Sequence, residues 1–535
     1  MRISLARVLV WFVCGCACGQ QLLQVENAAS LRTGDIAAGS LVQLDLFPQG
    51  GGPVAPLDPA TVSAKLLPMG FHDPLPLPIR EILDPLSVLV LIPRDTPVGN
   101  AGVTLNYNGQ TASQNVNIVA TSFGLYSAGF GGAAVAQNVT AHGLQPNNLT
   151  HPAHPQDFVT LWGTGLGAAS ADQVIVLLGG HPFPVAYAGP SAEFAGLDQI
   201  NFQMPDDPTI PQGCYVAVNI GVANSISNLA TLSLSRDEWP CRHPFGLTTD
   251  QLAQLDAGGR AYLGRINLYS TIGPVPGQSL SPQNGYVRMD FGDAEFLNYD
   301  ASGLSAISSP LFADDYLSGC KLSGGASASF IAVTGILNVG DQVNVLGPDR
   351  KELDLLPQGL DLPSLYSGSE PTSPVVDSPN QLPAAFFSAG EWQAIAPGSS
   401  TVQPFSFMVA VPNPIQITNY DQTKAVDHTK DLTVTWDPTT YSDADFVNVQ
   451  LYGQLPTKYF GPSQSVFCRI PALAGQATIP AAMLATFPPA TGSLSLSIER
   501  KSGTVELSKI ELNDGTSIPA AFQYHSAEWI FVQFQ

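Results

Sequence analysis

Residues 157–167 read Asp157-Phe-Val-Thr-Leu-Trp-Gly-Thr-Gly-Leu-Gly167, and they open the segment that decides the fold. Further runs rich in Val, Ile, Leu and Thr begin at Val174, Gln199, Gly213 and Ser227. Most of these runs alternate apolar with polar residues, and Gly, Pro or Asp-Asp clusters separate them. This spacing is typical of antiparallel strands in a β-sandwich.

The same order of strand and turn occurs earlier in the chain. Val90-Leu-Ile-Pro, an acidic turn and Gly99 match Phe202-Gln-Met-Pro, an acidic turn and Gly213. Proline ends a strand because it has no N–H to donate, and glycine supplies the backbone conformation that the turn requires. The pattern predicts two tandem sandwiches, over residues 22–119 and 120–238.

Short motifs occur in a fixed order over residues 22–235: Val25-Glu-Asn-Ala-Ala-Ser, Trp162-Gly-Thr-Gly-Leu-Gly, Val185-Ala-Tyr-Ala-Gly, Gln199-Ile-Asn-Phe-Gln-Met-Pro and Ser227-Asn. As an ordered set they resemble a domain family found in secreted proteins of soil acidobacteria, of the Solibacter type, which is similar in plan to the Ig-like IPT/TIG sandwiches. The resemblance implies this architecture and export, and it implies no activity. The first copy departs from the pattern at Asp45-Leu-Phe-Pro, where a glycine-rich turn is expected.

The first 19 residues have the pattern of a secretory signal peptide. Arginines at positions 2 and 7 precede an apolar run over Val8–Val13, and small residues lead to Gly19. This pattern favours cleavage before Gln20. The stretch Val13-Cys-Gly-Cys16 is also a loose lipobox, which leaves a lipid anchor at Cys16 as the alternative. We expect a secreted or cell-surface protein with no membrane-spanning segment after cleavage.

Composition excludes several classes of partner. The 535 residues carry 43 acidic and 21 basic side chains, a net charge of −22, and only 12% are charged, against about 25% in an average protein. So acidic a chain repels nucleic acid and anionic lipid heads. With 44% hydrophobic residues it can fill several cores.

Four cysteines remain after signal removal: Cys214, Cys241, Cys320 and Cys468. An even number in an exported chain favours disulfides, and four cysteines allow three connectivities. We favour Cys214–Cys241, because Cys214 opens a strand and Cys241 follows the last strand of the second sandwich, so that their pairing fastens the exit of that domain. The second pair is then Cys320–Cys468. A zinc site is the weaker alternative because the chain lacks CxxC and HxxxH spacing around them.

Residues 239–261 form a linker that contains a helix signal. Thr248 stands at the capping position with Gln251 three residues later, Leu252 and Leu255 follow, and Gly258-Gly259 ends the pattern. This is a capping box with a glycine stop. We expect one short helix that packs both leucines against a neighbouring domain.

Strand signals return in the second half and predict two more domains. We expect a β-sandwich over residues 262–412 and an Ig-like or fibronectin-III-like sandwich over 413–535. In the last domain, strict alternation places Leu432, Val434 and Trp436 on one face, with Trp436 as the core anchor. The fold class is therefore all-β, with four tandem sandwiches and one linker helix.

Four carboxylates near one another, Asp290, Asp293, Glu295 and Asp300, could supply the acid pair of a glycoside hydrolase. Acidic residues are also common along solvated strand edges, which is the reading we favour. Asp437, Asp443 and Asp445 could hold Ca²⁺, but the glycine and glutamate of a calcium loop are missing.

The remaining motifs favour structural roles. His151-Pro-Ala-His154 could hold a metal, but its prolines prevent the helix that places both rings on one face, so a solvated loop is favoured. Gly129-Phe-Gly-Gly and Gly163-Thr-Gly lack the context of a dinucleotide loop and predict turns. Trp392, Tyr366 and Phe386–Phe387 could form a sugar-stacking platform, although aromatic residues in sandwiches usually lie in the core.

These observations predict an exported, non-enzymatic structural or recognition array. We expect no cofactor and no metal, and an extracellular carbohydrate or protein as partner. The alternative is a secreted polysaccharide hydrolase whose carboxylates lie within residues 262–412. No GxSxG, HExxH or P-loop motif is present in the sequence.

Overall fold

The computed structural model describes residues 21–535, apart from 49–55, 129–131, 142, 180, 224, 237–239, 276–284, 302, 305–318, 325–333, 359–364, 444, 454–463, 486, 488–490 and 501–505. β-Strands make up 54% of the structure and helices are few, which confirms the all-β class. The predicted signal peptide and the alternative anchor at Cys16 lie outside the described residues. Within the described residues, every helix is too short or too polar to cross a bilayer.

The first sandwich packs two sheets around one core. One sheet has the order β1-β3-β7-β6 and the other β2-β9-β8-β4-β5. Val25, Leu44, Val88 and Val103 from the two sheets are fully buried between them. Its strands are β1 (Gln21–Asn27), β2 (Asp35–Ala37), β3 (Leu41–Pro48), β4 (Ser63–Pro68), β5 (Leu75–Leu77), β6 (Ile79–Asp84), β7 (Ser87–Leu91), β8 (Gly99–Tyr107) and β9 (Gln110–Val119).

The second sandwich follows the same plan. Its strands are β10 (Gly124–Leu125), β11 (Ala136–Thr140), β12 (Gly143–Pro146), β13 (Phe158–Thr164), β14 (Val174–Leu178), β15 (His181–Pro184), β16 (Tyr187–Pro190), β17 (Asp198–Gln203), β18 (Gly213–Val222), β19 (Ser225–Ile226) and β20 (Ala230–Leu234), with a 3-10 turn, η1 (Ala171–Gln173). One sheet runs β12-β11-β13-β17-β16 with β10 on β13, and the other runs β15-β14-β18-β19 with β20 on β18. The repeated strand, acidic turn and strand form β7–β8 and β17–β18, and each pair crosses from one sheet to the other.

A buried amide joins the first two sandwiches. Asn27 at the end of β1 is 1% exposed, and its Nδ2 donates to the carbonyls of Ser122 (2.9 Å) and Thr164 (3.2 Å) in the second sandwich. Arg32 adds bonds to the carbonyls of Ile226 (2.7 Å) and Ser227 (3.2 Å). Because a buried amide needs partners for its donors, this arrangement fixes how the sandwiches meet.

The predicted linker helix is present as α1 (Thr249–Asp256). Thr248 caps it and Gln251 completes the capping box. Leu252 and Leu255 are buried in a fifth hydrophobic cluster, which also contains residues of the second sandwich and of the long strands that follow. The helix therefore packs both leucines at the junction between domains, as expected.

The structure contains the disulfide between Cys214 and Cys241, with Cα atoms 5.0 Å apart. Both cysteines belong to the cluster around α1. The bridge fastens the exit of the second sandwich to the start of β18. This pairing agrees with the connectivity that the sequence favours.

We expect loss of this bridge to lower the free energy of unfolding by about 3.5 kcal/mol, from the entropy of closing a loop of 27 residues. Urea unfolding of the Cys214→Ser, Cys241→Ser double variant, followed by near-UV circular dichroism, measures the loss. Wild type with a reducing agent serves as the second reference. An unchanged urea midpoint would show that the α1 cluster holds the junction without the bridge.

The second half of the chain forms one continuous 15-stranded sheet and a small second sheet, β31-β34. Its strands are β21 (Ala261–Pro274), β22 (Tyr286–Tyr299), β23 (Gly319–Gly324), β24 (Thr334–Ile336), β25 (Val343–Leu346), β26 (Glu352–Pro357), β27 (Leu365–Ser369), β28 (Gly390–Ala396), β29 (Phe405–Val411), β30 (Ala425–Val426), β31 (Leu432–Thr435), β32 (Asp445–Gly453), β33 (Gln464–Pro471), β34 (Gln476–Ile479), β35 (Thr491–Arg500), β36 (Glu506–Glu511) and β37 (Ser517–Phe534). Short helical segments are η3 (Pro348–Arg350), η4 (Pro379–Gln381), α3 (Tyr420–Thr423), η5 (Ala472–Ala474) and α4 (Ala481–Leu484).

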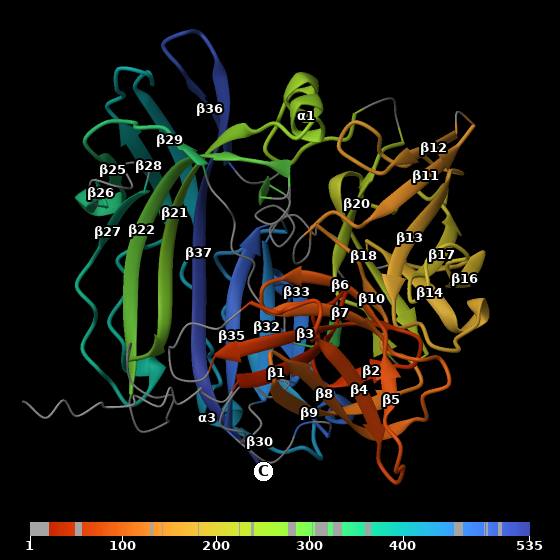
Figure 1. Cartoon of the computed structure of the whole chain (residues 1–535). Helices are drawn as coiled ribbons and strands as arrows, with labels where there is room; N and C mark the ends of the chain where they lie inside the picture. Colours follow the sequence, from red (N-terminus) through yellow and green to blue (C-terminus); the bar gives the residue numbers. More distant parts are fainter. Residues whose placement is uncertain are drawn as a thin grey trace, which may run out of the picture.

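Strand β37 belongs to both halves of this sheet. Its first part pairs in parallel with β21, from Gly264↔Ala520 to Ile272↔Glu528, and its last part pairs antiparallel with β35. Figure 1 shows β21, β22 and β37 as long strands on one side of the molecule, with the first two sandwiches on the other. Sharing this strand makes a continuous scaffold of the last two units.

Two hydrophobic cores lie along this sheet, one for each predicted domain. Trp392 and Phe387 are fully buried in the first core, and Trp436 is 3% exposed in the second, where it was expected as the anchor. Ile510 and Phe522 from the end of the chain pack in the first core, and β23 pairs with β33 beside the second. The predicted boundary at 412/413 stays a prediction, since strands of each segment enter the other's sheet.

Candidate functional site

The carboxylates predicted as an acid pair come from β22, and strand alternation divides them. Asp290 is 7% exposed, and its Oδ2 accepts a hydrogen bond from the Phe386 backbone N–H (2.9 Å). Asp293 and Glu295 are half-buried and point to the opposite side of the sheet. The hypothesis that Asp290 acts with them is therefore wrong, because the side chains of a strand alternate between its faces.

Asp293 and Glu295 do lie on one face, with α-carbons about 7 Å apart as for residues two positions apart in a strand. The Asn267 amide donates to Asp293 (2.8 Å), and Arg265 forms an ion pair with Glu295. Tyr299 also donates to Glu295 (3.1 Å). Both carboxylates are thus held by neighbouring side chains.

An aromatic stack stands beside these carboxylates. Tyr269 on β21 lies between Phe291 (ring centroids 4.6 Å apart) and His525 (4.9 Å), with the rings nearly parallel. Burial, with a contribution from Arg265, lowers the pKa of His525 to about 4, so the ring is neutral at pH 7 and its Nε2–H faces Asn267 Oδ1 at 3.3 Å. Burial and the nearby Asp293 raise the pKa of Tyr269. The rings cover one another's faces, which suits a structural stack.

Asp300, the fourth carboxylate, lies past the end of β22. It pairs with Arg260 at 3.5 Å. This ion pair joins the start of β21 to the end of β22. It does not bring Asp300 together with the other three carboxylates.

The other candidate metal residues are bound within loops. His154 Nδ1 donates to the Ser235 carbonyl (2.9 Å), and His151 Nδ1 lies 3.1 Å from the Thr150 hydroxyl. Asp445 is 2% exposed and accepts bonds from Ser442, and Asp437 accepts the Thr439 N–H (3.0 Å). No group of three or more His, Cys, Asp or Glu side chains suited to a metal occurs in the described part of the chain.

The hypothesis of a sugar-stacking platform at Trp392 is wrong. Trp392, Tyr366 and Phe387 are each 0% exposed and belong to one core, while Phe386 packs against it. The rings of Phe387 and Trp392 meet edge to face at 4.9 Å. These aromatic residues hold the sheets together, and Trp392, Tyr366 and Phe387 offer no surface to a ligand.

The glycine motifs behave as turns where they are described. In Gly163-Thr-Gly-Leu-Gly, a Cβ on Gly163 would lie 2.2 Å from the Phe123 ring, and one on Gly167 would lie 2.0 Å from the Ala120 carbonyl oxygen. These glycines let the chain between the first two sandwiches pack directly against β13. In the other motif, residues 129–131 lie outside the described residues.

The predicted Cys320–Cys468 bridge has partial geometric support. The two residues are direct register partners on β23 and β33. The Cys320 side chain lies outside the described residues, so the bond stays a prediction.

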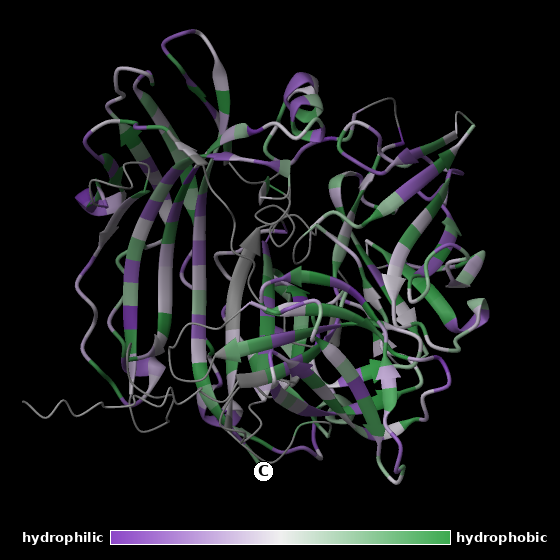
Figure 2. Ribbon diagram, in the orientation of Figure 1, coloured by the Kyte–Doolittle hydropathy of each residue, from purple (hydrophilic) through white to green (hydrophobic). Residues whose placement is uncertain are grey.

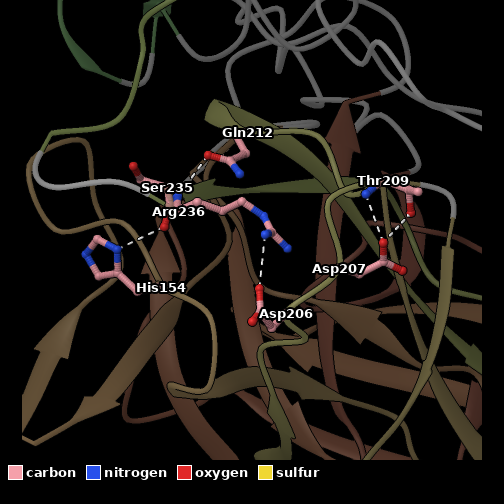
Figure 3. Close-up of polar contacts among 7 residues, drawn as sticks. All are labelled: His154, Asp206, Asp207, Thr209, Gln212, Ser235 and Arg236. Carbon is pink, nitrogen blue, oxygen red and sulfur yellow. Dashed lines mark hydrogen bonds and ion pairs between the residues drawn. The ribbon is translucent and has the colours of Figure 1, made fainter.

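A small depression with a cavity volume of about 10 Å³ lies at one end of the second sandwich. Figure 3 shows the polar groups around it. The Arg236 guanidinium pairs with Asp206 (3.0 Å), and the Arg236 backbone N–H donates to the Gln212 side-chain oxygen. The Asp207 carboxylate accepts from the Thr209 N–H. Its size is below the roughly 300 Å³ of small ligand pockets. Most of these polar groups pair with neighbours in the same loops, and within the described residues the buried Nη2 of Arg236 makes no hydrogen bond.

The outer face of the sheet β12-β11-β13-β17-β16 is the most distinctive exposed surface. The inward side chains of β13 and β17, such as Val159 and Phe202, fill the second core. The outward side chains follow from the strand register and are Gln137, Val139, Leu144, Pro146, Phe158, Thr160, Trp162, Tyr187, Gly189, Gln199, Asn201 and Gln203. We call this set the outer face. It contains no Asp, Glu, Lys or Arg, and Figure 1 shows its strands at the edge of the molecule.

Aromatic and amide side chains dominate the outer face. Phe158 and Tyr187 are each 41% exposed, and Leu144 is 67% exposed. The Gln199 amide donates to Asn201 Oδ1 (2.9 Å), which orders the two side chains relative to each other. Sequence reasoning missed this site, although strict alternation in Gln199-Ile-Asn-Phe-Gln was a signal that the amides point away from the core.

No protein-family model matches the chain, and no curated protein matches it. Among solved structures it is similar to bovine butyrophilin (TM-score 0.15, 10% identity, 40% of this chain and 99% of that chain). It is also similar to SGBP-B from a xyloglucan utilization locus of Bacteroides uniformis (TM-score 0.17, 10% identity, 66% of this chain and 86% of that chain). A third is invasin, a bacterial integrin-binding protein (TM-score 0.13, 12% identity, 94% of this chain and 79% of that chain). TM-scores this low support no conclusion about function.

Proposed function

We propose that the chain is an exported scaffold that holds tandem β-sandwiches in fixed order and presents a recognition surface outside the cell. The observation that carries the proposal is that every neighbouring pair of units is joined through buried contacts. Asn27 joins the first two, the α1 cluster with its disulfide joins the second to the long strands, and β37 joins the last two.

Export is part of this proposal. The signal-like N-terminus of the sequence supports it, and so does the Cys214–Cys241 bridge, because disulfides persist in oxidising compartments. Fractionation of cells that express the full chain, with immunodetection in medium, envelope and cytoplasm, tests it. Recovery of the chain only in the cytoplasm, with both thiols reduced, would overturn export.

Small-angle X-ray scattering of the mature chain tests the scaffold. We expect one compact particle whose scattering profile fits a single arrangement of the units. A profile that requires an ensemble of independently moving units would overturn the proposal, since buried joints leave little freedom between neighbours.

The second candidate function is polysaccharide hydrolysis by Asp293 and Glu295, and the fact that they share one face favours it. Their bonds to Asn267 and Arg265 favour a structural role instead. We expect wild type to release no reducing ends from a panel of soluble polysaccharides. Release that is abolished by Asp293→Asn and by Glu295→Gln, with folding unchanged, would establish the hydrolase.

A further inference from the structure

Tyr187 lies flat on the outer face of the second sandwich. Its hydroxyl donates to the carbonyl of Pro190 (2.9 Å), three residues along the same strand. Between them stands Gly189, where an added Cβ would lie 2.9 Å from the hydroxyl oxygen and 3.1 Å from Cζ. The ring therefore covers the glycine with one side, and the other side faces solvent with the side chain 41% exposed. A fixed, exposed ring face is a stacking platform that loses little entropy on binding.

A row of uncharged polar groups leads away from this platform. Gln137, Thr160, Asn201 and Tyr187 are direct register partners on β11, β13, β17 and β16. Thr160 is only 6% exposed, so the accessible groups of the row are those of Gln137, Asn201 and Tyr187. At about 4.8 Å between strands, the row spans about 14 Å. It is long enough for a short oligomer that crosses the strands.

The amides of this face have hydrogen-bonding capacity to spare. Asn201 Oδ1 accepts from Gln199, and within the described part of the chain neither Asn201 Nδ2 nor Gln199 Oε1 makes a hydrogen bond. Beside the row, Phe158 (41% exposed) and Trp162 (half-buried) add further aromatic surface. The same sheet face thus carries amide donors and acceptors together with aromatic rings.

The absence of charge from this face identifies the ligand class. In a chain of net charge −22, a surface that bound cations or basic peptides would carry carboxylates, and one that bound anions would carry Lys or Arg. A neutral polyhydroxylated chain needs amide hydrogen bonds and aromatic stacking and no charge. We infer that the outer face binds a neutral glycan chain, with Tyr187 as the stacking platform and Asn201 as the central hydrogen-bonding residue. This inference rests on the proposed recognition function and names its ligand class.

Affinity electrophoresis and titration calorimetry with the mature full chain test the inference. The probes are soluble β-glucan, galactomannan and dextran, with polygalacturonate as the charged comparison. We expect binding to at least one neutral glycan and none to polygalacturonate. Tyr187→Ala and Asn201→Ala should each weaken binding about tenfold or more, which corresponds to 1.4 kcal/mol. Phe194→Ala, which removes an aromatic residue 62% exposed in the loop between β16 and β17 and not part of the outer-face set, should bind like wild type.

The outcomes separate the site from the general function. If glycan binds and neither Tyr187→Ala nor Asn201→Ala weakens the binding, the assignment of the site to the outer face is wrong. The proposed recognition function would still stand. If no neutral glycan binds, the glycan inference fails. If the chain forms a concentration-dependent dimer and Tyr187→Ala makes it monomeric, the face binds a second copy of the chain. That result would also overturn the inference of glycan binding. Folding of both variants is checked by thermal unfolding, and Tyr187→Phe, which keeps the ring, should retain most of the affinity.

Discussion

Replacing Glu528 with glutamine is expected to raise the free energy of unfolding at pH 8 by about 5 kcal/mol and to leave it nearly unchanged at pH 4. Glu528 on β37 is 0% exposed. Burial raises its pKa from 4.5 to about 8, and the Ile417 N–H and the Arg288 charge oppose the shift. Each pKa unit corresponds to 1.36 kcal/mol, so a shift of this size is a large fraction of the stability of one domain.

The direction follows from proton binding in the two states. Between pH 4.5 and 8 the unfolded glutamate has released its proton, whereas the folded one keeps it. The folded state thus loses stability as pH rises through this window and loses no more above it. Glutamine cannot ionise and removes the loss, while its amide oxygen can still accept the Ile417 N–H, which lies 2.7 Å from Glu528 Oε2.

Urea unfolding of wild type and Glu528→Gln at pH 4, 6 and 8 measures the effect. We expect the difference in the free energy of unfolding between the two proteins to grow with pH. His243 and His525, whose pKa values are lowered to about 3 and about 4, weaken both proteins equally below pH 6.5, so their effect cancels in that difference. Glu391→Gln, at an exposed position of β28, is the control and should show no such trend. A Glu528→Gln difference that is the same at pH 4 and pH 8 would mean that burial does not raise the pKa of Glu528 above its value in the unfolded chain.

Local patterns made much of the fold predictable. Period-two alternation placed Leu432, Val434 and Trp436 in the core, because a strand must turn its apolar side to the facing sheet. The capping box of α1 is a signal contained within four residues, so the sequence alone predicted it. The Cys214–Cys241 bridge was also favoured in advance, because Cys214 opens a strand of the second sandwich and Cys241 follows its last strand.

The relations that the sequence did not reveal are long-range pairings. Parallel pairing of β21 with β37 joins Gly264 to Ala520, and no local pattern specifies a partner so far along the chain. For the same reason, Trp392 and Tyr366 could be interpreted as a platform: apolar patterning identifies buried faces only when the covering elements are known. The outer face was overlooked because its residues were interpreted only as parts of strands.

Replacing Asn27 with alanine is expected to lower the free energy of unfolding by about 4 kcal/mol and to free the first two sandwiches from each other. Besides its two bonds across the joint, Asn27 Oδ1 accepts from the N–H groups of Ala29 (2.9 Å) and Ser30 (3.1 Å). Alanine leaves two carbonyls and two N–H groups without these partners in a buried site, and each lost bond costs about 1 kcal/mol or more. The joint is sensitive because its parts are tightly packed: a Cβ on Gly165 would lie 2.3 Å from the Ser122 carbonyl oxygen.

The measurement must separate loosening from general destabilisation. Limited proteolysis near residue 120 and small-angle scattering should both show a mobile first sandwich in Asn27→Ala, while the glycan-binding face of the second sandwich stays intact. The control is Asn117→Ala, which removes an exposed amide bond within the first sandwich, to the Asp35 carboxylate (2.9 Å), and leaves the bonds of Asn27 in place. The prediction fails if Asn27→Ala keeps the wild-type scattering profile and resists cleavage. In that case the packing of glycines against residues 120–124 holds the two sandwiches together without the amide. The hydrogen bonds of Asn27 would then serve only the turn that follows β1.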